Sequence, residues 1–356
     1  MGCGGSKNSS RISDDHQDAV LFTFLRSQAV ALLDAQWLVE FAQTGQPLAP
    51  RQQLPPDAFI SLSTLKAASQ GARHAYIIML SYPWQSREHP DPDGITLRLL
   101  STVLRSFLSL PGGKSWGVFW DFASLYQHPD PAKGVMRTPK EDSLFKQGLG
   151  GLGTFYSHPR TFVLRLTSIP DGCFSAVDYA DRGWCHTESC WSSMIKHRSY
   201  VWNLGNLDGS ETSFDVVRAK CTGGMSRPAP LTSAAFTKTL SSKKFTNGKD
   251  DEPLVKQLYA DHFTTAFSSV KKLRYDGLGW GDQEALHVAE VLASGAAKSL
   301  ETLDLSRNKI GDEGAIAIAT AVKSIPKLKW LYLNDNQVGA RGRSALTAAG
   351  HSPTSW

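Results

Sequence analysis

The chain has 356 residues, a length typical of two or three domains. Its 41% hydrophobic and 20% charged residues are ordinary for a folded globular protein and exclude a mostly disordered or fibrous chain. The net charge is +5, and this mild excess is spread along the chain, so nucleic-acid binding is not predicted. The five cysteines form no paired framework, which favours reduced thiols in the cytoplasm.

The first residues match a lipidation pattern. Gly2 and Ser6 fit the N-myristoylation pattern, and Cys3 beside Gly2 is a candidate for S-palmitoylation. One acyl chain binds a membrane marginally, whereas two anchor a protein stably. No segment has the composition of a spanning helix. We therefore expect a cytoplasmic protein that is attached to a membrane by acyl groups on Gly2 and Cys3, with residues 1–14 as its flexible start.

The next segment, residues 15–70, is predicted to be helical. Between residues 20 and 41, leucines such as Leu21, Leu25 and Leu32 recur at helical spacing, and Gly45 and Pro47 end the pattern. This predicts one amphipathic helix. It either packs against the rest of the chain or lies on a membrane surface.

The middle third alternates between strand and helix patterns, and we assign residues 71–205 to one domain. Apolar runs at 76–81, 116–122, 161–166 and 200–204 predict buried strands, and helical patterns lie between them. Repeated strand–helix units predict an α/β fold, with a parallel sheet between two helical layers. Ligands of such sheets bind beyond the carboxyl ends of the strands. These ends carry Ser81, Asp121 and the loop before Arg182.

Three motifs follow these strand ends in order, over residues 76–84, 120–127 and 179–188. They resemble the three motifs of the fungal heterokaryon-incompatibility (HET) domain, which has a TIR-like, flavodoxin-like fold. The run from Trp184 to Glu188 is also similar to the Trp-Cys-x-x-Glu segment of plant TIR domains, where the glutamate is catalytic in NAD hydrolysis. The chain departs from the HET pattern at Gln85, at Ala123-Ser124-Leu125 and at Thr187.

The resemblance implies NAD as a substrate, Glu188 as the catalytic residue, and substrate-binding roles for Tyr82, Trp84, Asp121 and Trp184. The residues themselves leave alternatives open. Glu188 shares a helix face with aromatic residues, where it either serves a functional site or forms a salt bridge to Arg182 or Arg160. Tyr82 and Trp84 could stack on a nucleobase, and they could equally be core aromatics. Asp121 could accept a bond from a ribose hydroxyl, and it could equally cap a helix. Whether the chain is an enzyme, an NAD glycohydrolase, therefore stays open.

Neither a metal site nor a bound cofactor is predicted in this domain. Cys185 and Cys190 lie five residues apart, so they diverge on a helix and lack the paired spacing of zinc ligands. The next segment, residues 206–265, is rich in Gly, Ser, Thr and Lys, and we interpret it as a linker that contains short helices.

The last third, residues 266–356, contains an internal repeat. The segment from Leu300 to Gly311 recurs 28 residues later, with leucines at its first, fourth and sixth places and asparagine at its ninth, Asn308 and Asn336. A weaker copy precedes them near Leu273. The pattern resembles leucine-rich repeats of the ribonuclease-inhibitor kind, which form a solenoid of strand–helix units. We expect both asparagines to bond the turning backbone after short strands.

These features lead to two hypotheses. The first is a membrane-tethered signalling protein whose TIR-like domain self-associates and whose repeats bind a protein partner. The second is an NAD-cleaving enzyme that uses Glu188. In both, a partner of the repeats would contact the outward side chains of their strands, Thr302, Asp304, Trp330 and Tyr332.

Overall fold

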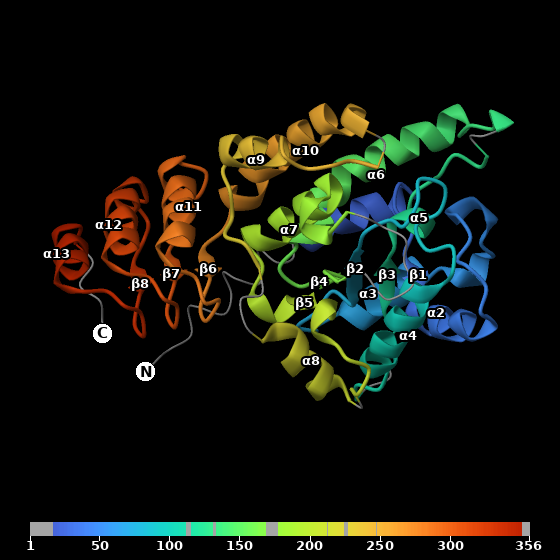
Figure 1. Cartoon of the computed structure of the whole chain (residues 1–356), viewed down its shortest axis with the longest axis horizontal. Helices are drawn as coiled ribbons and strands as arrows, with labels where there is room; N and C mark the ends of the chain where they lie inside the picture. The colour runs from blue at the N-terminus through green and yellow to red at the C-terminus, as the bar shows by residue number, and fades with distance from the viewer. Residues whose placement is uncertain are drawn as a thin grey trace.

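The computed structural model describes residues 17–111, 115–130, 133–168, 177–211, 213–223, 227–246 and 248–350. Figure 1 shows an α/β part built around a sheet, followed by a row of three strand–helix units that ends at the C-terminus. Within the described ranges, no helix combines the length and the apolarity needed to cross a bilayer.

The first sheet is mostly parallel. Its order is β1-β3-β2-β4-β5, and only the edge strand β1 runs antiparallel to its neighbour. Each parallel strand is short and almost wholly buried, which explains its continuous apolar sequence. The prediction of an α/β domain with a parallel sheet is confirmed. The strands are β1 (Leu33–Asp34), β2 (Ile77–Ser81), β3 (Gly117–Phe119), β4 (Phe162–Arg165) and β5 (Val201–Asn203).

Helices cover both faces of this sheet. Alternate residues of β2 point to opposite sides, so that Ile78 and Leu80 join one apolar cluster while Ile77 and Met79 join the other. The first cluster is closed by α2 (Ala35–Phe41), α4 (Ile95–Leu108) and α8 (Phe214–Thr222). The second is closed by α6 (Pro139–Ser157) and α7 (Gly183–Met194).

The single long helix predicted between residues 20 and 41 is wrong. Residues 17–26 are helical, but Gln28 adopts a left-handed backbone with φ of 61°, and the chain then continues into β1. Leu33 pairs with Val118 of β3, and Asp34 caps α2 by accepting from the Gln36 N–H at 2.8 Å. Leu33 thus lies at a sheet edge, and the Asp34 side chain is the N-cap of α2. The helix α3 (Leu62–Ser69) follows.

The strand predicted at 116–122 is shorter than expected. It ends at Phe119, and Asp121 opens the one-turn helix α5 (Asp121–Ser124). Short 3₁₀ helices make other connections, at Ala42–Thr44, Arg51–Gln53, Pro56–Ala58, Tyr179–Asp181, Arg198–Tyr200, Leu204–Asn206, Gly248–Asp250 and Val322–Ser324.

The segment predicted as a linker holds α8, α9 (Ser233–Leu240) and α10 (Asp251–Ser268). The last of these has 18 residues, longer than the short helices expected there, and it packs on α6 and α7. Tyr259 of α10 is fully buried and stacks on Phe236 of α9, with 3.7 Å between ring centroids. α9 and α10 therefore form an outer layer over one side of the α/β part, whereas α8 lies on the opposite face of the sheet (Figure 1).

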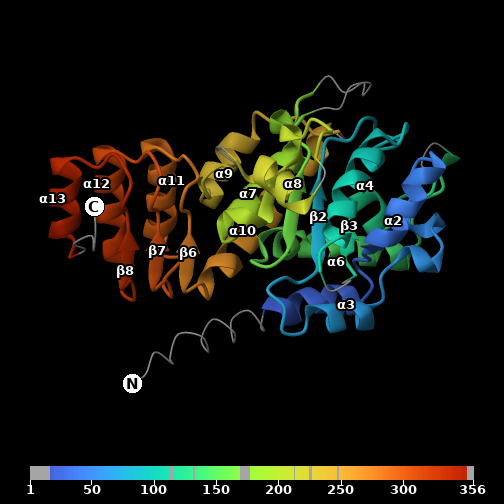
Figure 2. The ribbon, with the colours of Figure 1, turned by 90° about the horizontal axis from the view of Figure 1, so that it is seen from below.

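Three strand–helix units complete the chain. Their strands form a second parallel sheet in the order β6-β7-β8, and their helices lie side by side as a second layer (Figures 1 and 2). The units are β6 (Lys272–Arg274) with α11 (Asp282–Ala293), β7 (Thr302–Asp304) with α12 (Asp312–Ala321), and β8 (Trp330–Tyr332) with α13 (Ala340–Ala348).

The units share one apolar core with the α/β part. Tyr275 and Trp280 of the first unit are at most 1% exposed and belong to the same cluster as the residues beneath α7. The Tyr275 hydroxyl donates to the Met194 carbonyl at the end of α7, and the Trp280 indole donates to the Arg227 carbonyl at 3.1 Å. The first repeat is thereby fixed to the helical layer of the α/β part.

Candidate functional site

The sheet formed by β6, β7 and β8 presents a ladder of outward side chains. Leu273, Leu303 and Leu331 are paired in register and point into the core. The residues on either side of each leucine point outward, because successive side chains alternate along a strand. They form two rows, Lys272, Thr302 and Trp330, then Arg274, Asp304 and Tyr332. We refer to these six residues as the strand face. It contains all four residues predicted as partner contacts.

Trp330 is the most unusual residue of the strand face. Its side chain is 50% exposed, and it is the only aromatic among the large hydrophobic residues that are exposed in the described part of the chain. Tyr332, two residues later, is half-buried. An indole left in water on an ordered strand supplies a large apolar surface that a partner can cover.

Asn308 and Asn336 hold the turns beneath this face. The Asn308 Oδ1 accepts from the Leu278 N–H at 2.9 Å and the Trp280 N–H at 3.2 Å, and its amide donates to carbonyls of both its own unit and the preceding one. Asn336 repeats this arrangement one unit later, accepting from the Ile310 N–H at 3.0 Å. Both asparagines are thus structural, as the repeat pattern predicted.

A second ladder was missed from the sequence. The Asp282 carboxylate at the start of α11 accepts from the N–H groups of Gly311 and Gly314 in the next unit, and Asp312 does the same for Gly339 and Gly342. A Cβ on Gly314 would lie 2.7 Å from the Asp282 carboxylate, so glycine is required there. The signal was available, since Gly-Asp-x-Gly stands at residues 311–314 and parts of it recur at Gly281-Asp282 and at Gly339 and Gly342.

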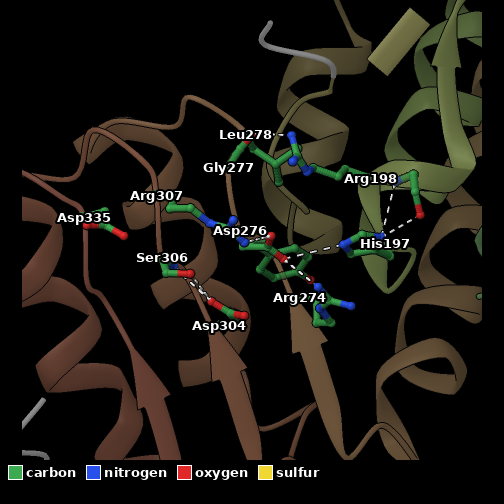
Figure 3. A network of polar contacts seen from close by, with 12 residues as sticks. His197, Arg198, Arg274, Asp276, Gly277, Leu278, Asp304, Ser306, Arg307 and Asp335 are labelled. Atoms are coloured by element: carbon green, nitrogen blue, oxygen red, sulfur yellow. Dashed lines mark hydrogen bonds and ion pairs between the residues drawn. The ribbon is translucent and has the colours of Figure 1, made fainter. Parts of the chain in front are cut away.

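The corner between the strand face and the α/β part holds a polar network (Figure 3). Asp276, which follows β6, is 2% exposed. Its carboxylate faces Arg307 at 2.9 Å, Arg274 at 3.5 Å and His197 at 3.6 Å. Burial and the neighbouring Arg274 lower the pKa of His197 to about 4, so its imidazole is neutral at pH 7. The network was not predicted from the sequence.

The carboxyl end of β2 holds the second candidate site. The next two strands of the chain, β3 and β4, lie on opposite sides of β2, so the strand order reverses there. Ser81 at the end of β2 pairs in register with Arg165 at the end of β4. Ser81 Oγ donates to Glu188 Oε2 of α7 at 2.5 Å and lies 2.7 Å from the Tyr179 hydroxyl.

Glu188 is buried in this cluster, with 7% of its surface exposed. Burial raises the pKa of its carboxyl to about 8, against a smaller opposing effect of the Ser81 hydrogen bond. Neither salt bridge considered for it is formed: Arg160 pairs with Asp18, and Arg182 Nε donates to the Val177 carbonyl at 3.0 Å. Glu188 is therefore mostly protonated at pH 7, and its catalytic role stays a prediction.

Tyr82, Trp84 and Asp121 form a cluster of their own. Asp121 accepts from the Tyr82 hydroxyl and the Trp84 indole, both at 2.8 Å, and burial raises the pKa of its carboxyl. These contacts join the loop after β2 to the start of α5. Trp184 lies apart from them, because its indole donates to Asp251 of α10 at 2.9 Å. The structure thus gathers three of the five predicted site residues of this domain and places Glu188 in the neighbouring cluster.

A cavity of about 250 Å³ opens at this edge. Glu188 does not line it, and neither does Asp121. Trp84 forms one wall, and the basic side chains of Arg87, Arg182 and Lys244 form others. Cys185 is buried below, where its thiol donates to the Tyr82 carbonyl and burial raises its pKa.

The predicted lipidation sites, Gly2 and Cys3, lie outside the described residues. Among the residues that are described, no group of three or more His, Cys, Asp and Glu side chains could hold a metal ion.

Comparison with known proteins supports the repeat pattern. A family model described as a leucine-rich repeat matches residues 296–319, from the loop before β7 through most of α12. No curated protein matches the chain. Leucine-rich repeats present an extended surface for partners, so the match suggests protein–protein interaction.

Proposed function

We propose that the chain is a protein-interaction module that binds a protein partner on the strand face. In this proposal the three units form a leucine-rich-repeat solenoid of the ribonuclease-inhibitor kind, supported by the match at residues 296–319. The observation that carries the proposal is the exposed indole of Trp330 at the outer end of the ladder. Binding energy in protein interfaces is concentrated in such aromatic side chains, which are enriched at interface centres.

Affinity capture from cells that express the tagged full chain tests this function. Trp330→Ala should lose a specific partner that the parent retains. Leu286→Ala is the matched control, since Leu286 is an apolar side chain on α11 with a similar exposure, 46%. If the parent and both variants recover the same proteins in the same amounts, the strand face is not the binding surface.

For the α/β part, we propose a domain of the HET/TIR kind that acts in signalling and self-associates. A second function, NAD cleavage, is favoured by the position of Glu188 at the reversal point of the strand order. Beside it, the 250 Å³ cavity offers the Trp84 ring for stacking. Once its proton is lost, the Glu188 carboxylate near the ribose would stabilise an oxocarbenium-like transition state.

Nicotinamide release by concentrated, purified protein tests the second function. The parent should release nicotinamide from NAD, and Glu188→Gln should abolish the release while the variant stays folded by circular dichroism. A parent that releases none when clustered on liposomes excludes the enzyme and leaves the interaction module.

We also propose that acyl groups on Gly2 and Cys3 hold the chain at the cytoplasmic face of a membrane. The support is the match of these residues to the acylation pattern. Attachment to a surface would raise the local concentration of the chain and so favour self-association.

A further inference from the structure

The corner around Asp276 carries more positive than negative charge. Three arginines converge there, Arg274 and Arg307 from the repeats and Arg198 from the α/β part, whose Nη1 donates to the Gly277 carbonyl at 3.0 Å (Figure 3). Asp276 is the one carboxylate that pairs with them among the described residues. Since His197 is neutral at pH 7, three positive charges face one negative charge.

The backbone is left-handed at one equivalent residue of each unit. Gly277, Arg307 and Asp335 occupy equivalent places in the three units, and all are left-handed, with φ of 62°, 57° and 57°. Glycine suits the first unit, where a Cβ would lie 3.3 Å from the Arg198 guanidinium carbon. In the second unit the left-handed backbone is less favourable for Arg307 than it would be for glycine, because a residue with a Cβ loses about 1 kcal/mol in this conformation. In this conformation the Arg307 guanidinium reaches Asp276, and 59% of the Arg307 side chain is still exposed.

The strand face changes in character from β6 to β8. At β6, Lys272 and Arg274 are both exposed, and at β8 the exposed side chain is Trp330. The carboxylate between them, Asp304, accepts from the Ser306 N–H at 3.1 Å and from its hydroxyl at 2.6 Å. Asp304 thus places negative charge in the middle of the face, so excess positive charge lies only at the β6 end.

We propose that the partner bound by the strand face is an extended acidic segment with one large apolar side chain. Its carboxylates lie against Lys272, Arg274 and Arg307, and its apolar side chain covers Trp330. This inference rests on the proposed interaction function and adds the chemistry and direction of the partner.

The geometry also sets the spacing of the segment. Two strand separations, about 10 Å, divide β6 from β8. An extended peptide advances about 3.3 Å per residue, so its apolar residue should lie about three residues from the nearest carboxylate. The segment crosses the strands, which leaves Asp304 beneath an uncharged residue.

Fluorescence anisotropy with the full chain and three labelled peptides tests the inference. The probes are Glu-Glu-Glu-Ser-Gly-Phe, the same peptide with lysine for glutamate, and the acidic peptide with serine for phenylalanine. The first should bind most tightly, and its affinity should fall as salt rises from about 50 to 300 mM, because salt screens exposed charges. Equal binding of the acidic and basic peptides, or no binding of the first at millimolar concentration, overturns the inference.

Variants locate the binding site. Lys272→Glu and Arg307→Gly should each weaken binding of the acidic peptide at least about threefold, the usual scale for an exposed ion pair. Trp330→Ala should make the phenylalanine and serine peptides equivalent. Lys323→Glu is the matched control, because Lys323 is an exposed lysine next to α12 in the helical layer. Arg307→Gly relaxes the left-handed backbone, so it should remain folded, and Lys272→Glu alters no described contact.

The outcomes separate this inference from the function on which it rests. If Trp330→Ala loses the captured partner but Lys272→Glu affects neither that partner nor the peptide, the partner is not acidic and only the inference fails. If Trp330→Ala also retains the captured partner, the interaction function itself fails.

Discussion

Replacing Asn308 by alanine is the most direct perturbation of the repeats. Its side chain is 7% exposed and bonds two N–H groups and two carbonyls within 3.2 Å. These belong to the second unit and to the first, including the N–H groups of Leu278 and Trp280. Alanine removes all of these bonds and leaves the backbone groups without a side-chain partner.

The expected cost follows from the number of buried groups that lose a partner. A buried donor without an acceptor costs about 1–3 kcal/mol, so the two N–H groups together predict a loss of roughly 2–6 kcal/mol. Asn336→Ala should cost less, about 1–2 kcal/mol, because one N–H is lost and the half-buried site admits water. The first unit should be affected most, since Leu278 and Trp280 belong to it.

Urea unfolding followed by circular dichroism and tryptophan fluorescence measures these free energies. Asn334→Ala is the control, because the Asn334 side chain bonds only the neighbouring Asp335 carboxylate among the described residues. If Asn308→Ala unfolds within about 0.5 kcal/mol of the parent, or if Asn334→Ala costs as much, the asparagine ladder does not hold the repeats.

Two further predictions concern titration and location. The pKa of Glu188 is raised from 4.5 to about 8 on folding, so the unfolded chain releases its proton first and stability should fall as pH rises from 4.5 to 8. Glu188→Gln should lack this part of the slope in urea midpoints between pH 5 and 8, and identical slopes would contradict the buried, protonated carboxyl. Gly2→Ala should move the chain from the membrane to the soluble fraction of cells, and unchanged pelleting would rule out the acyl anchor.

The parts of the fold that could be predicted have strong, regular patterns. The buried strand near Ile77, the helix near Leu100 and the repeats around Leu303 show a single hydrophobic period over their full length. The pattern fails at residues 20–41, where leucines at helical spacing serve two helices and a sheet edge. Pairing with β3, in which Leu33 lies opposite Val118, 85 residues away in sequence, makes this segment a strand, and no local sequence pattern indicates that pairing.

The candidate sites also differ in whether a local sequence pattern determines them. The outward positions of Thr302 and Trp330 follow from strand alternation and were predictable. The corner around Asp276 was not, because it needs Arg198 from a different part of the fold to lie against Gly277. Likewise Tyr82 and Asp121 were predicted as separate ligand contacts, and their hydrogen bond to each other appears only once β2 and β3 lie side by side.

Separating the repeats from the α/β part should unfold them. Solenoids need about three units to be stable, and the solenoid proposed here has three described units without a polar cap at the first. In place of a cap, Arg227 bridges the two parts. Its guanidinium donates to the Ser192 carbonyl at 3.1 Å and lies 5.6 Å from the Tyr275 ring, and its own carbonyl accepts from the Trp280 indole.

A fragment of residues 266–356 loses these contacts and exposes part of the Tyr275 and Trp280 rings. Each ring buries about 150–250 Å² in the full chain, so exposing half of both costs roughly 4–6 kcal/mol, a large share of the stability of a small domain. Circular dichroism and proton–nitrogen correlation spectra of the fragment should therefore show an unfolded chain, and a dispersed spectrum with cooperative melting would refute this dependence.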